Sequence, residues 1–363
     1  RNSLVELRVC GEDRCRMSGW AHARRAALCF SLLVATPAAL SAHEAAGFRS
    51  SRAHPLLRTT CSRCATMSAA EAFPAGNPAP DASASSRAVG AAEGELWRPF
   101  LSIPINGQVV SAEGVLMATS VYLVAILVQL PIVLAYLWSR AFDQQRRRSV
   151  DWIIHFWAAT SMRICGFSPD IQGVENLPPA GQACVYVPNH SSFLDILTLT
   201  GFIPRPMKYI AEEAILNIPF IGWPMRLAGH IALARGSRRS QVETFKKSLE
   251  SLGGGNSLIV FPEGGRSANG RLKGFRGGPF KMASKCGVPI VPISICGLQR
   301  WYPKGSLLPV AVPKGVRVVV HPPIDVCGSG LSEAEALERA YAAINSALPE
   351  HQKGPSTPPH AED

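Results

Sequence analysis

Short apolar runs separated by helix-forming segments dominate the chain from about residue 170 onward. Runs that predict buried strands lie near residues 184, 257, 290 and 316. Helical segments precede or follow these runs, and strands that alternate with helices in this way build parallel sheets. The pattern predicts an α/β domain with a mixed, largely parallel sheet flanked by helices.

Two helices of the predicted domain carry clear signals at their ends. Ser240 and Glu243 form a predicted capping box, and Gly253 begins the glycine run that ends this helix. Ser332 and Glu335 make the same pattern ahead of the last helix. The expected inward faces are Val242, Phe245, Leu249 and Leu252 in the first helix, and Leu337, Tyr341, Ile344 and Leu348 in the last.

An almost uninterrupted apolar stretch, residues 115–138, precedes this domain and is long enough for one helix to cross a bilayer. Arg140 and the arginines at 146–148 follow at once, which favours the cytosolic or stromal side for that end. Residues 151–164 are rich in Trp, Ile and Phe and predict an interfacial helix. A helix buried in the protein core is the alternative for the apolar stretch.

Residues 1–95 are rich in Ala, Ser and Arg, a composition typical of targeting sequence. Arg24 and Arg25 precede an apolar stretch, residues 26–40, in the order of a signal peptide. Residues 48–63 carry arginines and no acid, as a transit peptide does. The two together predict a plastid envelope or a related membrane as the location. A plain disordered leader, a secretory signal and the endoplasmic reticulum are the alternatives.

The predicted organisation therefore has four parts. Residues 1–95 are the leader, 96–168 the membrane segment, 169–348 the α/β domain, and 349–363 a disordered tail.

The chain is basic, with 37 Lys and Arg against 26 Asp and Glu in 363 residues and a formal net charge of +11. This balance favours anionic partners. Nucleic acid is one candidate, with the basic leader as its binding arm, but the sequence has no RNP-type aromatic motif, zinc-ligand spacing or recognition-helix pattern. A membrane that contains anionic lipid agrees better with the apolar segment.

A histidine and an aspartate flank the start of a predicted helix. His190 follows the apolar run that ends at Val187, and Asp195 lies in the first turn of the helix expected from Phe193. The carboxylate can then accept the Nδ1 proton of the imidazole and leave Nε2 to take a proton from a substrate hydroxyl. Ser191 and Ser192 adjoin His190 and are poorly placed as nucleophiles, so a substrate hydroxyl is the expected attacking group.

A second loop, residues 262–266, follows the predicted strand near 257. Gly264 and Gly265 allow close approach of the backbone to a ligand, and Arg266 offers a planar fork for a phosphate. An ordinary tight turn is the alternative for the glycines alone. Because open α/β sheets bind ligands at strand ends, the two loops together predict one site.

Four blocks in this order resemble the 1-acyl-sn-glycerol-3-phosphate acyltransferases, most of all the plastid and cyanobacterial type. The resemblance covers roughly residues 173–326, half of the chain. The blocks are Asn189 to Asp195, Gly229 to Arg235, Phe261 to Ser267, and Val288 to Ile293.

The resemblance implies a role for each matching residue. His190 would be the general base and Asp195 the residue that orients it. The glycerol-phosphate group would be bound by Arg235, Glu263, Gly264, Gly265, Arg266 and Ser267, with Lys208, Lys273 and Arg276 keeping the surroundings basic. The expected acceptor is lysophosphatidic acid, the donor an acyl-carrier-protein or coenzyme A thioester, and the product phosphatidic acid. No metal and no bound cofactor is expected.

Two departures leave the acceptor headgroup open. Gly265 stands where the family commonly has Thr, and Glu212 where the plastid type commonly has Lys. An acyltransferase for another lysophospholipid is therefore an alternative. A catalytically silent lipid-binding membrane protein is a second, although an altered His190 or Asp195 would have been its expected mark.

Overall fold

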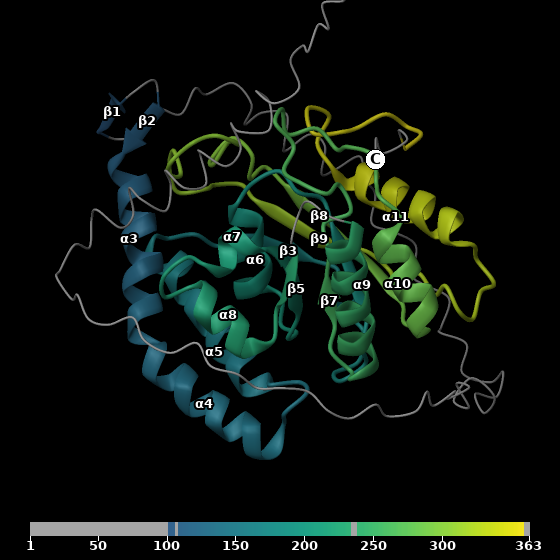
Figure 1. The fold of residues 1–363 in the computed structure, drawn as a ribbon. Coiled ribbons are helices and arrows are strands. Elements are labelled where there is room, and N and C mark those ends of the chain that lie inside the picture. The colour runs from purple at the N-terminus through teal and green to yellow at the C-terminus, as the bar shows by residue number, and fades with distance from the viewer. Residues whose placement is uncertain (1–100, 106–107, 234–237, 359–363) are drawn as a thin grey trace, which may run out of the picture. The chain divides into compact units, whose positions relative to one another are not determined.

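The structure, a computed structural model, describes residues 101–105, 108–233 and 238–358 (Figure 1). The predicted leader and Arg235 lie outside the described residues.

A seven-stranded sheet forms the centre of the described α/β domain. Its strand order is β3-β9-β8-β4-β7-β5-β6, and every neighbouring pair is parallel except β8 with β9. The predicted mixed, largely parallel sheet is therefore confirmed. In chain order the strands are β3 (Asp170–Gln172), β4 (Val185–Pro188), β5 (Lys208–Glu212), β6 (Ile231–Leu233), β7 (Leu258–Ile259), β8 (Ile290–Cys296) and β9 (Arg317–Val320).

The four strands predicted from apolar runs correspond to β4, β7, β8 and β9, whereas β3, β5 and β6 were not predicted. β3 and β6 are three residues long, which is too short to show the alternation of apolar and polar residues that predicts a strand. β5 opens with a lysine and closes with a glutamate, so its composition hides a strand whose interior is buried.

Helices cover both faces of the sheet. α9, α10 and α11 lie together on one side, while α5, α6 and α8 lie on the other (Figure 1). The buried core between the sheet and the first group includes Val187, Leu258, Phe280 and Tyr341. The helices are α5 (Arg148–Ile164), α6 (Leu194–Phe202), α7 (Glu213–Leu216), α8 (Gly222–Ala228), α9 (Arg238–Gly253), α10 (Gly278–Cys286) and α11 (Glu333–Ala347), with one 3₁₀ turn at Val174–Asn176.

The two predicted capping boxes had different outcomes. At α11 the Ser332 hydroxyl accepts the Glu335 amide and the Glu335 carboxylate accepts the Ser332 amide, as predicted. α9 begins at Arg238, so Ser240 lies inside the helix and the predicted start was wrong. Val242 is also half exposed rather than inward, because the helix is rotated so that Leu252 and its neighbours meet the sheet.

The apolar stretch forms two helices rather than the predicted single one. α3 (Ala112–Leu127) and α4 (Gln129–Phe142) follow a small hairpin, β1 (Ser102–Ile105) and β2 (Gln108–Ser111), and bend by 48° at Val128. Pro131 explains the bend, because it has no N–H for the Leu127 carbonyl and its ring crowds that carbonyl. Among the described helices none alone is long and apolar enough to cross a membrane, whereas this bent pair together meets both criteria.

α5, the predicted interfacial helix, begins three residues earlier than expected and is largely a core helix. Val150, Ala158 and Met162 are fully buried against α3, α4 and α6. Trp152 and Phe156 point outward and are about half exposed. The helix therefore joins the apolar surface of the N-terminal segment to the interior of the domain.

The end of the chain is not the predicted disordered tail as far as residue 358. Gln352 is buried, its carbonyl accepts the Leu272 amide at 2.8 Å, and its side-chain Oε1 accepts the Gly297 amide at 2.8 Å. The Tyr341 hydroxyl donates to the Pro355 carbonyl. This segment had no apolar pattern because its contacts are made mainly by backbone groups.

A buried ion pair anchors β5 to α5 at the edge of the sheet where the parallel strands begin. The Lys208 ammonium lies 2.6 Å from the Asp151 carboxylate, and both side chains are almost fully buried. Burial raises the pKa of Asp151 to about 7 and lowers the pKa of Lys208, because both charges are removed from water. Lys208 was expected to keep the surroundings of the phosphate site basic, but its ammonium pairs with Asp151 at the edge where the parallel strands begin.

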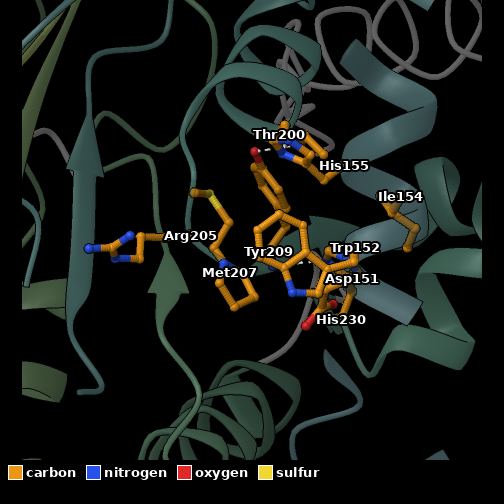
Figure 2. Close-up of a pocket in the computed structure, with 10 residues that line it drawn as sticks. Asp151, Trp152, Ile154, His155, Thr200, Arg205, Met207, Tyr209 and His230 are labelled. Carbon is orange, nitrogen blue, oxygen red and sulfur yellow. Dashed lines mark hydrogen bonds between the residues drawn. The ribbon is translucent and has the colours of Figure 1, made fainter. Parts of the chain in front are cut away.

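A small pocket lies beside this pair (Figure 2). Asp151 and His155 of α5, Thr200 of α6, and Tyr209 and His230 are among its lining residues. The Tyr209 hydroxyl contacts Thr200 at 2.9 Å, and the Tyr209 amide donates to the ring of His230. The pocket shares no residue with the predicted phosphate site, because it lies at the opposite edge of the sheet.

We expect Lys208→Ala to lower the free energy of unfolding by about 3–5 kcal/mol, because the carboxylate of Asp151 would stay buried without its partner. Chemical denaturation in detergent measures this change. Lys247→Ala is the matched control, since its pair with Glu243 on α9 is exposed and its loss should leave stability nearly unchanged. Equal effects of the two substitutions would contradict the prediction.

Candidate active site

The two predicted loops meet because the strands before them are neighbours. β4 and β7 pair in parallel, with Val185 opposite Leu258 and Tyr186 opposite Ile259. Parallel neighbours end at the same edge of a sheet, so the segments after Pro188 and after Ile259 emerge side by side. The predicted meeting of the two loops is confirmed.

His190 and Asp195 have the predicted geometry. The Nδ1 atom of His190 lies 2.9 Å from Oδ2 of Asp195, which is fully buried in the first turn of α6. The same oxygen accepts the amides of Ser191 and Ser192, each at 2.8 Å. These donors fix the carboxylate, which in turn fixes the ring of His190 and directs Nε2 away from it.

Neither serine is placed as a nucleophile for His190. The Ser192 hydroxyl donates to the carbonyl of Tyr302 and accepts the amide of Leu194. The Ser191 hydroxyl is buried and has no hydrogen-bond partner within the described part of the chain. Among the described residues, neither hydroxyl forms a hydrogen bond with the ring of His190, and a substrate hydroxyl stays the predicted attacking group.

Glu263 joins the two loops rather than facing open space. Its Oε1 accepts the amide of His190 at 2.6 Å, and its Oε2 accepts the amide of Lys273 at 3.2 Å. The side chain is buried. The expected contact of Glu263 with glycerol-phosphate is thus replaced by a positioning role, because both oxygens are used inside the protein.

Burial raises the pKa of Glu263 to about 8. The amides of His190 and Lys273 and the charge of Lys273 oppose the shift, and the nearby Asp195 adds to it. Loss of hydration thus outweighs the donors that hold the carboxylate.

The glycines after Glu263 let the loop close on itself. Gly264 has φ of +70°, a conformation that favours glycine, and a Cβ there would lie 2.8 Å from Nε of Arg276. The carbonyl of Gly265 accepts the Lys273 ammonium at 2.6 Å. Lys273 therefore braces the loop, whereas the Arg276 side chain is exposed beside Gly264.

Arg266 and Ser267 have different surroundings. The guanidinium of Arg266 is half buried and makes no hydrogen bond or ion pair with the described residues, so its donors are available to an anion. Ser267 is buried, its amide donates to the His190 carbonyl at 2.8 Å, and its hydroxyl donates to Asn269. Ser267 therefore ties the loop to His190 rather than offering its hydroxyl to a ligand.

Two residues of the predicted blocks have roles that the sequence did not reveal. The Asn189 side chain exchanges two hydrogen bonds with the backbone of Ile295 and so fixes the end of β4 to β8. The Phe261 ring stacks on the His190 ring with centroids 3.9 Å apart. An aromatic residue just ahead of the glycine turn was the available signal for the second contact.

Within the described ranges, no group of three His, Cys, Asp or Glu side chains is arranged to hold a metal ion. Arg235, the other predicted phosphate ligand, lies outside those ranges.

Comparison with known proteins agrees with this geometry. The family model described as Acyltransferase matches residues 168–296. A 1-acyl-sn-glycerol-3-phosphate acyltransferase of Chlamydomonas reinhardtii is 36% identical over 234 residues, which are 64% of this chain and 67% of that protein. The chain belongs to the acyltransferase family. The residues matched by the family model contain both loops of the candidate site.

Two further relatives extend the comparison. A chloroplastic 1-acyl-sn-glycerol-3-phosphate acyltransferase of Brassica napus is 41% identical over 204 residues, 56% of this chain and 58% of that protein. The crystal structure of the 1-acyl-sn-glycerophosphate acyltransferase PlsC from Thermotoga maritima is 26% identical with a TM-score of 0.52, over 64% of this chain and 92% of that one. The chain thus spans little more than half of its Brassica relative and shares the acyltransferase fold.

We expect Glu263 to contribute stability that is lost as pH rises from 4.5 to about 8, and Glu263→Gln to remove this contribution from the pH profile. The folded carboxyl keeps its proton where the unfolded chain has lost it, so its contribution is full below pH 4.5 and is lost as pH rises through the folded pKa. Melting temperatures of both proteins between pH 5 and pH 9 measure the difference. Identical pH profiles would contradict the burial argument.

Proposed function

We propose that the protein transfers an acyl group from a thioester to the sn-2 hydroxyl of lysophosphatidic acid, which gives phosphatidic acid. The observation that carries this proposal is the contact of His190 with the buried Asp195, beside a loop whose Arg266 has no hydrogen-bond or ion-pair partner among the described residues. The names of the relatives from Brassica napus and Chlamydomonas reinhardtii support the same acceptor.

In this reaction the acceptor is its own nucleophile. The sn-2 oxygen attacks the thioester carbonyl carbon while Nε2 of His190 takes the hydroxyl proton. Asp195 stabilises the imidazolium that forms, because its Oδ2 already contacts Nδ1. The tetrahedral intermediate then expels the thiolate, which takes the proton back from His190 and leaves as a thiol. No acyl-enzyme forms, and no metal or bound cofactor takes part.

The phosphate of the acceptor is assigned to the loop after β7. Arg266 supplies charged donors, and the exposed Arg276 lies beside Gly264 at the same turn. Glu263 and Lys273 hold this loop with side chains that bond to backbone groups, Ser267 holds it with its amide, and none of the three needs to touch the ligand. Arg235 is an additional proposed ligand.

The lipid substrates imply a membrane partner, and α3, α4 and α5 offer a surface for it. Large apolar side chains are exposed on these helices in a density that is unusual for a surface in water. Chloroplastic relatives support a plastid membrane as the location. The donor is an acyl-carrier-protein or coenzyme A thioester. The exposed residues include Leu116, Leu123, Leu127, Leu130, Leu134, Leu137, Trp138, Phe142, Trp152 and Phe156.

We expect His190→Ala to abolish acyl transfer, because the acceptor hydroxyl would lose its base, with a loss of about 100-fold or more. Ser191→Ala is the control and should keep most of the activity. Both are measured as phosphatidic acid formed by membranes that contain the protein. A covalent acyl group on Ser191 or Ser192 after incubation with donor alone would overturn the direct-attack mechanism.

We expect Arg266→Ala to raise the KM for lysophosphatidic acid about 10- to 100-fold, because a charge-assisted hydrogen bond is worth about 1.5–3 kcal/mol. Arg339→Ala, at an exposed position on α11, is the control. Lysophosphatidylcholine and lysophosphatidylglycerol are offered in the same assay. Preference for one of these by the wild-type protein would move the assignment to another lysophospholipid, and transfer to none would favour a silent lipid-binding protein.

A further inference from the structure

The segment from Pro349 to Pro358, here called the C-terminal strap, lies against the loop that carries Arg266. The carbonyl of Gln352 accepts the amide of Leu272 at 2.8 Å, and its side chain accepts the amide of Gly297 just beyond β8. Gln352 is only 1% exposed. Buried polar side chains are usually hydrogen-bonded, and the Oε1 atom of Gln352 is, whereas its buried Nε2 atom has no hydrogen-bond partner among the described residues.

α11 holds the strap from the other side. The Tyr341 hydroxyl donates to the carbonyl of Pro355, and the Asn345 side chain both accepts the amide of Gly354 at 2.9 Å and donates to its carbonyl. Tyr341 is fully buried and its ring meets the ring of Phe275 edge to face. The strap is therefore fixed between a helix and the loop after β7.

Gly354 permits this close packing. A Cβ at this position would lie 2.6 Å from the carbonyl oxygen of Leu272 and would also collide with the hydroxyl of Tyr341. Backbone atoms cannot give way as the end of a flexible side chain can. Any larger residue at 354 must lift the strap away from the loop.

A series of hydrogen bonds, joined by the peptide bond between Leu272 and Lys273, leads from the strap to the histidine. Leu272, which the strap holds, precedes Lys273, whose amide donates to Glu263 and whose ammonium donates to the carbonyl of Gly265. Glu263 in turn accepts the amide of His190. The buried carboxylate of Glu263 bridges the backbone amides of Lys273 and His190, so a displacement at Leu272 is passed through Lys273 to the histidine.

We propose that Gln352 and Gly354 of the C-terminal strap are positioning residues, which hold the loop between Pro262 and Arg276 in register with His190 for binding of the phosphate-bearing acceptor. This inference rests on the proposed function for its kinetic consequence. The physical coupling can be measured without it.

The first measurement is hydrogen–deuterium exchange of the full-length protein in detergent, for wild type, Gln352→Ala, Gly354→Ala and Glu350→Gln. Glu350→Gln is the matched control, because its exposed carboxylate contacts only Lys353 among the described residues. We expect faster exchange in peptides that cover residues 262–276 and residues 189–195 for the first two variants. The control should match wild type.

The second measurement is the kinetics of acyl transfer at a temperature where all variants are folded. We expect the KM for lysophosphatidic acid to rise about tenfold in Gln352→Ala and Gly354→Ala with a smaller change in kcat, because the loop binds the acceptor and His190 itself is retained. A merely structural role would lower the melting temperature and leave KM unchanged. Truncation after Leu348 should give the largest effect if the protein still folds.

The outcomes separate this inference from the proposed function. Faster exchange confined to the strap, with wild-type values at 262–276 and 189–195, overturns the coupling whatever the activity. Coupled exchange with no acyl transfer by wild type refutes the proposed function and leaves the positioning of the loop established. Coupled exchange with an unchanged KM overturns the role in acceptor binding.

Discussion

Parallel pairing of β4 with β7 is the constraint on which the site depends. It brings two loops that are about seventy residues apart in sequence to one edge of the sheet, but it does not by itself fix their distance. Glu263 does so, because one carboxylate accepts the amides of His190 and Lys273 and thereby spans both loops. The Ser267 amide adds a third bond, to the His190 carbonyl. The histidine is thus held by its backbone from one loop and by its ring from Asp195.

Ionisable groups are buried at both ends of the central strands, with different consequences. At the edge where the strands begin, Lys208 and Asp151 neutralise one another and lock β5 to α5. At the other edge, Glu263 has backbone donors but no ion pair of its own among the residues described here, and burial raises its pKa to about 8. Removing one partner is costly at the first edge. At the second edge, Glu263 can take up a proton. Its burial between the two loops then costs less, because the side chain is no longer charged.

Contacts between residues close in sequence could be predicted from the sequence, whereas contacts between distant residues could not. His190 and Asp195 are five residues apart across a strand end and a helix start, so their contact was predictable. Lys208 was assigned to the wrong site because its partner, Asp151, lies far away in a helix interpreted as interfacial. The C-terminal strap was missed because Gln352 and Gly354 act largely through backbone atoms, which leave no apolar period. The prediction of a single membrane helix was wrong because Pro131 lacks an N–H and the helix bends near it, although the apolar composition of the stretch was recognised correctly.

α5 connects the exposed apolar surface directly to α6, the helix that carries Asp195 of the candidate active site. Its outer face presents Trp152 and Phe156, while its inner face sends Asp151 to β5 and the ring of His155 to the Thr200 carbonyl of α6 at 2.8 Å. Since that carbonyl can only accept, His155 donates, and the bond fixes the end of α6, the helix that carries Asp195 in its first turn. Tyr209 adds a second bond to the same helix (Figure 2). The aspartate that orients His190 is therefore held at a set angle to the face that would meet lipid, with one helix between them.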